Sequence, residues 1–314
     1  MKKTFIAIAA AVLACVTAFT FTACGSGSFD PDKQITVVAR ELASGTREAF
    51  DTVVTDGTNF LMQKENGEKK YYTTDKAVVL NKTGDVMTKV AADRQAIGYI
   101  SLGSVNDTIK VIKVNGVEPS KTTVLNGTYK IQRPFVVMTN KTQTLTPVAA
   151  DFMSYLRSAS SEEHCNTAGT VYLSDPAKRG TADAPIAVES FTKQASLPSG
   201  GKIIVRGSTS MEKFIFAAAA GYAELYGADA DSIFDIELQG SSVGTSAVEG
   251  DTHGNVIGLS SSAVSKENII SFNVCLDAVA VIVNNDNNAV SDLTLKDLYT
   301  IFTGKTAKFS ELKK

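Results

Sequence analysis

Clusters of small hydroxyl residues and glycines follow four predicted strands of this chain, each at the point where its strand ends. The clusters are Ser44–Thr46, Gly207–Ser210, Gly240–Ser246 and Ser260–Ser262. In sheets of parallel strands, the carboxyl ends of the strands meet at one edge, and ligands bind beside that edge. One such cluster is usually a helix cap, but four at equivalent positions predict a shared pocket for a small anion.

The predicted strands alternate with predicted helices, which favours an α/β fold with mostly parallel sheets flanked by helices. Short apolar runs predict the strands, and apolar residues at helical spacing predict the helices. The clearest strands are Gln34–Ala39, Lys202–Arg206, Phe234–Leu238, Asn255–Leu259 and Val279–Asn284, and the clearest helices are Pro147–Leu156, Met211–Leu225 and Leu293–Phe302. At 314 residues, two lobes are expected rather than one core.

The first cluster is the most informative, because charged residues flank it. Ser44, Gly45 and Thr46 stand at the predicted N-terminus of a helix, where backbone N–H groups have no partner within the helix. Gly45 lets the backbone approach a ligand closely, and Arg40 and Arg47 add positive charge. The alternative is that Ser44 is only the N-cap of an ordinary helix.

The first 24 residues have the pattern of an export signal. Lys2 and Lys3 precede the apolar run Phe5–Phe21, and small residues then lead to Cys24. This arrangement resembles the cleavage site of bacterial lipoproteins. It predicts a signal peptide over 1–24, a lipid on Cys24, a tether over 25–33, and an extracytoplasmic protein anchored to the cell membrane. A plain secretory peptide and an uncleaved anchor helix are the alternatives.

Charge, histidines and cysteines limit the other classes. The formal net charge is −2 and no basic run lies beyond the N-terminus, so we expect no nucleic-acid partner. His164 and His253 stand far apart without a cysteine or carboxylate at ligand spacing, so we expect neither a metal site nor a cofactor. Cys165 and Cys275 either pair outside the cell or remain buried thiols, and the sequence leaves both open.

Several further motifs, which together span nearly all of the chain after the tether, form a specific joint pattern. They are Arg40–Phe50, Ala96–Ser101, Val114–Pro119, Gly207–Met211, Gly240–Gly244, Ile257–Ser261 and Leu298–Lys305. In these motifs the chain resembles the phosphate-binding lipoproteins of bacterial ABC-type phosphate transporters.

The resemblance implies a two-lobed periplasmic-binding-protein-like fold of type II, with a ligand cleft between the lobes and no enzymatic activity. It also implies a monomer that captures inorganic phosphate, or a similar tetrahedral oxyanion, for ABC permease subunits. The ligand-binding residues would be Arg40, Ser44, Gly45, Thr46, Thr209, Ser210, Ser241 and Ser261.

The order of the motifs departs from the family pattern. In the family, the motif at Gly207–Met211 comes first, and the motif at Arg40–Phe50 follows the one at Leu298–Lys305. A circular permutation explains the swap, with 174–198 as the new linker between the old chain ends. Recombination between tandem copies of a gene is the competing explanation.

A permutation also predicts where the lobes divide. One lobe would be 132–284, and the other would combine 34–131 with 285–314. Both ends of the folded chain would then lie side by side on the second lobe.

Three positions near the predicted ligand differ from residues common in the family. Ser261 stands where many members have an acid, and Ser262 stands where others have arginine. A carboxylate accepts the proton of hydrogen phosphate and repels sulfate, whereas a hydroxyl can donate to either, so selectivity is open. Leu42 replaces an acid that steadies the motif arginine, which predicts that Arg40 is held less firmly.

Two further classes of function compete with anion capture for transport. A serine hydrolase is conceivable because His253 is near Ser241 in sequence, but no Gly-x-Ser-x-Gly elbow surrounds the serine. A phosphate sensor or surface adhesin that keeps the fold without transport is the other alternative. The changes at Leu42, Ser261 and Ser262 would be its trace.

Overall fold

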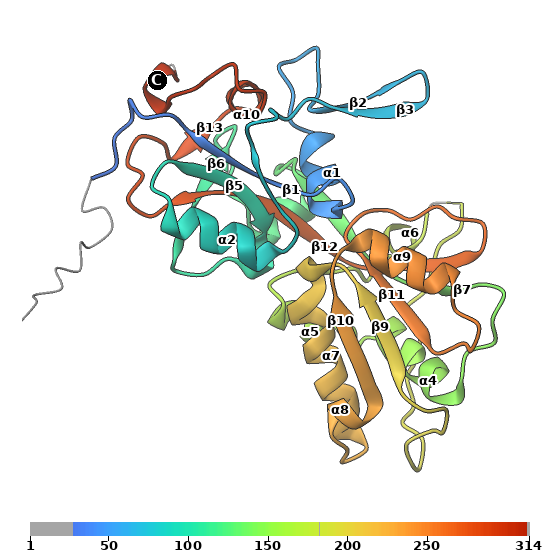
Figure 1. The fold of residues 1–314 in the computed structure, drawn as a ribbon. Helices are drawn as coiled ribbons and strands as arrows, with labels where there is room; N and C mark the ends of the chain where they lie inside the picture. The colour runs from blue at the N-terminus through green and yellow to red at the C-terminus, as the bar shows by residue number, and fades with distance from the viewer. Residues whose placement is uncertain (1–27, 182, 313–314) are drawn as a thin grey trace, which may run out of the picture.

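The computed structural model describes residues 28–181 and 183–312, in which strands and helices alternate along the chain (Figure 1). The strands are β1 (Thr36–Arg40), β2 (Met62–Glu65), β3 (Glu68–Tyr71), β4 (Val78–Leu80), β5 (Ala96–Ser101), β6 (Ile109–Val114), β7 (Gln132–Asn140), β8 (Val171–Tyr172), β9 (Ile203–Gly207), β10 (Phe234–Leu238), β11 (Val256–Ser260), β12 (Ile269–Asn284) and β13 (Asp292–Leu293). The predicted α/β fold is confirmed.

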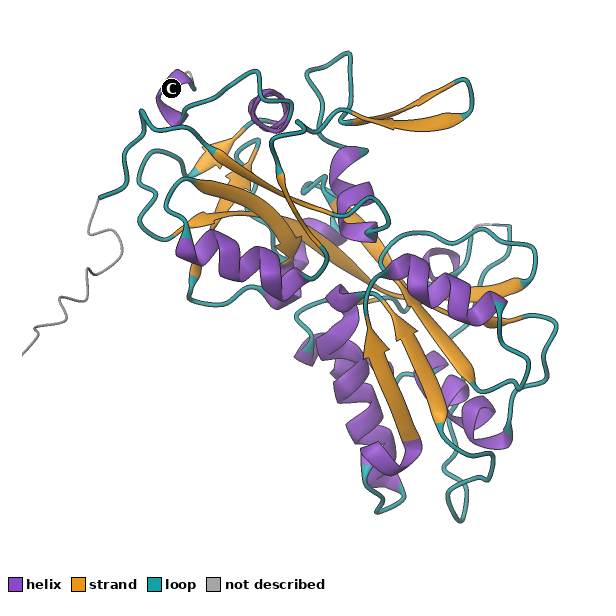
Figure 2. Ribbon diagram, in the orientation of Figure 1, coloured by secondary structure: helices purple, strands orange, loops and turns teal. Residues whose placement is uncertain are grey.

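The helices lie on both faces of the sheet (Figure 2). They are α1 (Gly45–Asp51), α2 (Thr83–Ala92), α3 (Lys121–Leu125), α4 (Pro147–Arg157), α5 (Ser161–Thr167), α6 (Pro176–Arg179), α7 (Glu212–Leu225), α8 (Ala230–Ile233), α9 (Ser241–Glu249) and α10 (Leu295–Phe302), with short 3₁₀ turns at Leu102–Ser104, Thr209–Met211 and Phe309–Glu311. Local sequence sets several of these limits. Pro147 occupies the first turn of α4, and Thr294 and Asp297 form a capping box at the start of α10.

The main sheet has the strand order β10-β9-β11-β7-β12-β5-β1-β4, with β6, β8 and β13 paired beside this path. The outer strands pair in parallel, as β1 does with β4 and β5, and as β9 does with β10 and β11. The prediction of mostly parallel sheets is wrong for the centre, because β12 is antiparallel to β5, β6, β7 and β8. β7 and β12 cross between the two halves in opposite directions, so they can pair only in the antiparallel sense.

The molecule has two halves, and each has its own hydrophobic core. The first half contains α1, α2 and the C-terminal helix α10, and the second half contains α4, α7 and α9. In the first half, Phe50, Tyr99 and Phe302 pack on one face of the sheet, and Val38, Val86 and Ile282 pack under α2 on the other. In the second half, Phe152, Phe214 and Tyr222 lie on one face, and Met138 and Val248 lie under α9 on the other. Each half is thus a layer of strands between layers of helices.

The structure moves the predicted boundary of the second half. The sequence predicts one lobe over 132–284, but Ala278, Val279, Val281 and Val283 belong to the core of the first half. The predicted strand Val279–Asn284 is only the end of β12, which runs through both halves. Asn273 and Asp277 interrupt the apolar pattern, so the sequence did not reveal the long strand.

The predicted linker 174–198 is mostly exposed, but its first turn is anchored in the second half. The Arg179 side chain is completely buried and donates hydrogen bonds to the backbone carbonyls of Leu173 and Arg157, at 3.1 and 2.8 Å. Its guanidinium also lies over the ring of Phe272, 5.1 Å from the ring centre. A purely surface connection was therefore the wrong interpretation for this turn.

The two ends of the described chain lie side by side on the first half. Gln34 forms an antiparallel bridge with Lys308, and the Ile35 N–H donates to the Ala307 carbonyl at 2.7 Å. The rings of Phe29 and Phe309 pack with their centres 5.7 Å apart. The prediction that the two chain ends lie side by side is confirmed for these residues. A circular permutation requires chain ends that are close together in this way.

The predicted signal over 1–24 and the predicted lipidation residue Cys24 lie outside the described residues. Within 28–181 and 183–312, no helix combines the length and apolar character needed to cross a membrane.

Candidate functional site

The cluster that follows β1 begins a helix, as predicted. Ser44 is the N-cap of α1, and its hydroxyl accepts hydrogen bonds from the backbone N–H groups of Thr46 and Arg47, at 3.2 and 3.4 Å. Ser44, Gly45 and Thr46 are all buried. Ser44 is therefore a helix cap, so any contact it makes with a ligand comes in addition to that role.

Arg40 ends β1 and is held firmly, which corrects the expectation based on Leu42. Its Nε and Nη2 atoms donate to the two carboxylate oxygens of Glu41, at 2.9 Å each, and Nη2 also donates to the Asn81 carbonyl. The Leu42 side chain is 57% exposed. The acid that orients Arg40 is thus its immediate neighbour Glu41 rather than a residue at position 42.

The remaining nitrogen of Arg40 faces hydroxyl groups. Its Nη1 atom donates to the Oγ1 atoms of Thr46 and Thr83, at 3.5 and 3.3 Å, and both contacts are long for hydrogen bonds. Only 2% of Arg40 is exposed. The two N–H groups of Nη1 therefore make only weak hydrogen bonds, and they are directed at a buried group of hydroxyls.

Arg47 has a different role from the predicted one. Its Nε donates to Asp51 at 3.0 Å, and its Nη1 donates to the backbone carbonyl of Arg40 at 2.8 Å. The guanidinium lies over the ring of Tyr71. Arg47 thus holds the end of β1 in place, and Asp51 neutralises its charge.

In the second half, the other hydroxyl clusters converge at the ends of neighbouring strands β9 and β11. The Ser208 hydroxyl donates to the Ser261 hydroxyl at 2.9 Å, and the Ser241 and Ser261 hydroxyls lie 3.2 Å apart. The Ser261 N–H donates to the Ser241 hydroxyl at 3.1 Å. Because β9 and β11 run in parallel, their carboxyl ends bring these serines together. Ser262 lies outside this group and contacts Ser260 instead.

The hydroxyls of the two halves meet in one buried group, which we call the hydroxyl cluster: Thr46, Thr83, Ser208, Thr209, Ser210, Ser241 and Ser261. The Thr46 and Ser210 hydroxyls lie 3.0 Å apart, and the Thr83 hydroxyl lies 3.3 Å from those of Thr209 and Ser210. Gly45 packs against Ser261 so closely that a β-carbon on Gly45 would lie 2.6 Å from the Ser261 carbonyl carbon. All eight residues expected to bind the ligand lie at this junction.

Thr83 is the member of the cluster that the sequence analysis missed. It begins α2, shortly after the three-residue strand β4. The same pattern of strand, hydroxyl and helix marks the other clusters. Here it was hidden because β4 is short and the segment before Thr83 is polar and rich in lysine.

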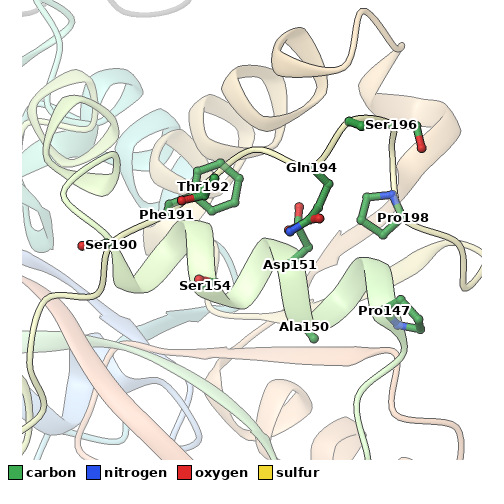
Figure 3. Close-up of a pocket in the computed structure, with 11 residues that line it drawn as sticks. Pro147, Ala150, Asp151, Ser154, Ser190, Phe191, Thr192, Gln194, Ser196 and Pro198 are labelled. Carbon is green, nitrogen blue, oxygen red and sulfur yellow. The ribbon is translucent and has the colours of Figure 1, made fainter.

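A separate hollow of about 730 Å³ lies between α4 and residues 190–198 (Figure 3). Asp151 lines it and accepts hydrogen bonds from the Tyr222 and Tyr226 hydroxyls, at 2.7 Å each. None of its lining residues belongs to the hydroxyl cluster. In the described part of the chain, no three His, Cys, Asp or Glu side chains gather in a way that could hold a metal ion.

The histidine required by a serine hydrolase does not contact the clustered serines. His253 lies before β11, and its Nδ1 atom pairs with the Thr252 hydroxyl at 2.9 Å. Ser241 lies past the opposite end of that strand, where the hydroxyl and N–H of Ser261 are its partners. The described geometry therefore gives Ser241 no general base.

Two α/β halves that share a buried polar site at their junction define a substrate-binding protein. In agreement, residues 26–160 and 192–312 match the family model described as the PBP superfamily domain, so the chain belongs to that superfamily. The chain is 33% identical over 306 residues to the phosphate-binding protein PstS 2 of Streptococcus pneumoniae TIGR4, covering 95% of this chain and 96% of the relative. It belongs to the family of these phosphate-binding proteins.

Two further comparisons agree. The identity to PstS 2 of Streptococcus agalactiae 2603 V/R is 33% over 301 residues, covering 93% of this chain and 92% of the relative. The crystal structure of a phosphate-binding protein of a phosphate ABC transporter from S. pneumoniae superposes with a TM-score of 0.62 at 31% identity. It covers 89% of this chain and 100% of that chain.

The family model matches the chain in two separate segments, 26–160 and 192–312, which lie on either side of most of the predicted linker. These matches do not give the order of the motifs in the relatives, so recombination between tandem gene copies stays the competing explanation. Permutation relative to other family members stays a prediction, and so does the assignment of 174–198 as its linker.

Asp51 makes the stability of the folded state depend on pH. Burial raises the pKa of Asp51 to about 6, although Arg47 opposes the shift. The folded protein therefore holds a proton that the unfolded chain releases between about pH 4 and 6. Within this range, the free energy of unfolding should fall as the pH rises, by about 2–3 kcal/mol in total from this group. We expect Asp51→Asn to remove this part of the pH dependence.

Urea unfolding of the two proteins between pH 4 and 7 measures the effect. Asp107→Asn is the control, because Asp107 is an exposed turn residue that is no member of the hydroxyl cluster. A difference in unfolding free energy between Asp51→Asn and the unsubstituted protein that stays constant over this range would contradict the prediction.

Proposed function

We propose that this protein captures inorganic phosphate, or a similar tetrahedral oxyanion, outside the cytoplasm and delivers it to an ABC permease. The observation that carries the proposal is the hydroxyl cluster, in which groups from both halves and Arg40 converge within hydrogen-bonding distance of one another. Streptococcal relatives of nearly the same length are named phosphate-binding proteins.

The ligand residues in this proposal are Arg40, Ser44, Gly45, Thr46, Thr209, Ser210, Ser241 and Ser261, and we add Thr83. In the closed molecule the hydroxyls satisfy one another, and an entering oxyanion takes over as their common acceptor. Hydrogen bonds to a charged acceptor contribute about 1.5–3 kcal/mol each, so several exceed the cost of closing the two halves. Binding and release need a hinge motion at the crossing strands β7 and β12.

Each buried arginine near the junction already has its own acid. Arg40 pairs with Glu41, Arg47 with Asp51, and Arg133 on β7 with Asp277 on β12. The bound anion would therefore be stabilised mainly by directed N–H and O–H groups rather than by an excess of positive charge. Such groups lose strength less steeply with added salt than an exposed patch of lysines does.

The predicted signal and lipid on Cys24 would place this site outside the membrane, held by the tether 25–33. Three sequence changes, at Leu42, Ser261 and Ser262, supported the sensor or adhesin alternative. Its support is weakened, because Glu41 holds Arg40 in place of the acid that Leu42 replaces.

A thermal-shift panel of phosphate, arsenate, sulfate and molybdate on the chain without its first 24 residues tests the proposal. A ligand at 100 times its dissociation constant adds about 2.7 kcal/mol to the stability of the folded state. We expect stabilisation by phosphate and arsenate. We also expect it by sulfate, since in the described residues the hydroxyls of Ser208, Ser241 and Ser261 bond to one another and to no carboxylate.

The panel includes a control for general salt effects, which is chloride at the same ionic strength. No shift with any of the four oxyanions would contradict capture and favour the adhesin alternative, because a phosphate sensor would also be stabilised by phosphate. A response to phosphate and arsenate without sulfate would show that another group accepts the phosphate proton.

A further inference from the structure

The two cysteines of the second half come from distant segments and meet in the same core. Cys165 lies on α5, before the connection 174–198, and Cys275 lies on β12, after it. Both belong to the hydrophobic core of the second half, and neither side chain is exposed. Neither takes part in the hydroxyl cluster, so the proposed function leaves them without a role.

Short-range hydrogen bonds place the two cysteines beside each other. Strand β8 pairs with β12 so that Tyr172 is opposite Cys275. Thr170, just before β8, donates its N–H and its hydroxyl to the Cys165 carbonyl, at 2.9 and 3.0 Å. These bonds turn the end of α5 back onto β8 and so hold Cys165 next to the strand that contains Cys275.

The thiols also contact each other. Burial raises the pKa of the Cys275 thiol, and its hydrogen bond with the Cys165 side chain adds to the shift. The backbone holds this core fixed, and the two thiols in it are in contact. They therefore already lie as close together as a disulfide requires.

We propose that Cys165 and Cys275 form a disulfide when the chain folds outside the cytoplasm, and that this bond joins α5 to β12 across the connection 174–198. The inference takes from the proposed function only the oxidising location and is independent of anion binding. In the unfolded chain, this bond would close a loop of about 110 residues and so lower the conformational entropy of the unfolded state. The folded state therefore gains stability.

The oxidant in the test is a small disulfide such as oxidised glutathione. The thiolate of Cys165 attacks its S–S bond, forms a mixed disulfide and releases one thiol. The thiolate of Cys275 then attacks the Cys165 sulfur and releases the second thiol, so the protein loses two hydrogens and the oxidant becomes two thiols. Because both side chains are buried in the folded state, we place the exchange before the core closes.

Peptide mapping tests the bond directly. The full chain is refolded from denaturant with reduced and oxidised glutathione, its free thiols are blocked with iodoacetamide, and it is digested with trypsin without reduction. Cleavage after Arg157, Lys178, Lys266 and Lys296 releases peptides 158–178 and 267–296. We expect one product in which these two peptides are linked. Both peptides carrying the blocking group or glutathione would overturn the inference.

Thermal unfolding tests the consequence. We expect the melting temperature of the bridged protein to exceed that of the same protein with a phosphine reductant by about 10 °C. Cys165→Ala is the matched control, in which the reductant should have no effect. Equal melting temperatures of bridged and reduced protein would overturn the role of the bond. A bridged protein that does not respond to phosphate would overturn the proposed function and leave this inference intact.

Discussion

Arg40→Ala is expected to weaken phosphate binding by about 10²–10⁴-fold, far more than Ser208→Ala. The Nη1 atom of Arg40 is directed into the hydroxyl cluster, and its present contacts with Thr46 and Thr83 are long. A bound anion would replace these contacts with two charge-assisted hydrogen bonds. At about 1.5–3 kcal/mol each, their loss corresponds to this range of dissociation constants.

Ser208 is the matched control because it belongs to the same cluster and is equally buried. Its hydroxyl accepts from the Ser210 N–H and donates to Ser261, so it supports the other ligand residues instead of facing the anion. We expect a loss of less than about tenfold from Ser208→Ala, since the two hydrogen bonds that are removed join neutral protein groups and neither involves the anion. Titration calorimetry with phosphate measures both. Equal losses would refute the role given to Arg40.

The Arg40→Ala result has one other possible cause, which a second variant separates. Removing Arg40 leaves the Glu41 carboxylate without its partner, and a negative charge near the cluster repels the ligand. In the double variant Arg40→Ala with Glu41→Gln, this repulsion is absent. We expect most of the loss in binding to persist in the double variant, because the donors themselves are missing.

The sequence predicted which hydroxyl residues gather at the junction of the two halves, because the same pattern of small hydroxyl residues is repeated along the chain. Gly207–Ser210 and Ser260–Ser262 follow strands that run in parallel, so their carboxyl ends meet at one edge of the second half. Ser44–Thr46 follows β1 of the first half, which runs opposite to these strands, and the contact between the halves brings it to the same place. The short apolar runs marked the strand ends clearly. Thr83 escaped the prediction because its strand has only three residues and follows a polar, lysine-rich segment.

The expectations for Arg40 and Arg179 were wrong because the partners of both side chains depend on side-chain direction, which the periodicity of the sequence does not give. Leu42 suggested a poorly held arginine, but the Glu41 side chain lies on the same side as the Arg40 guanidinium and accepts hydrogen bonds from two of its three nitrogens, Nε and Nη2. Arg179 sits in a polar, exposed-looking segment, yet its guanidinium caps backbone carbonyls inside the second half. In both cases the partner is chosen by side-chain direction, and sequence spacing does not give that direction.

The long strand β12 could not be predicted from the sequence for a similar reason. Asp277 interrupts its apolar pattern and suggested a break between two elements. In the structure Asp277 is opposite Arg133 on β7, and their buried ion pair lies where the two strands cross between the halves. A buried charge is tolerated inside a strand when its partner is in register on the neighbouring strand. Only the pairing of β7 with β12 could have revealed that partner.

Gly45→Ala is expected to abolish closure of the two halves and to weaken phosphate binding by at least about a hundredfold. A β-carbon at this position would lie 2.6 Å from the carbonyl carbon and the hydroxyl oxygen of Ser261, and 2.7 Å from its carbonyl oxygen. These are largely backbone atoms at the end of β11, which cannot rotate away as a flexible side chain could. The halves must separate, which lengthens the hydrogen bond between the Thr46 and Ser210 hydroxyls and removes the anion's ligands on one side.

Gly84→Ala is the matched control for this prediction. Gly84 also lies in the first turn of a helix near the cluster, but a β-carbon there would meet nothing within 4 Å. We expect its phosphate affinity to be unchanged. Both variants should melt near the temperature of the unsubstituted, phosphate-free protein, because Gly45 does not have a positive φ and the open molecule accommodates the methyl group. If Gly45→Ala binds phosphate as tightly as Gly84→Ala, the ligand does not require the close approach of Gly45 to Ser261, and the junction between the halves is not the binding site.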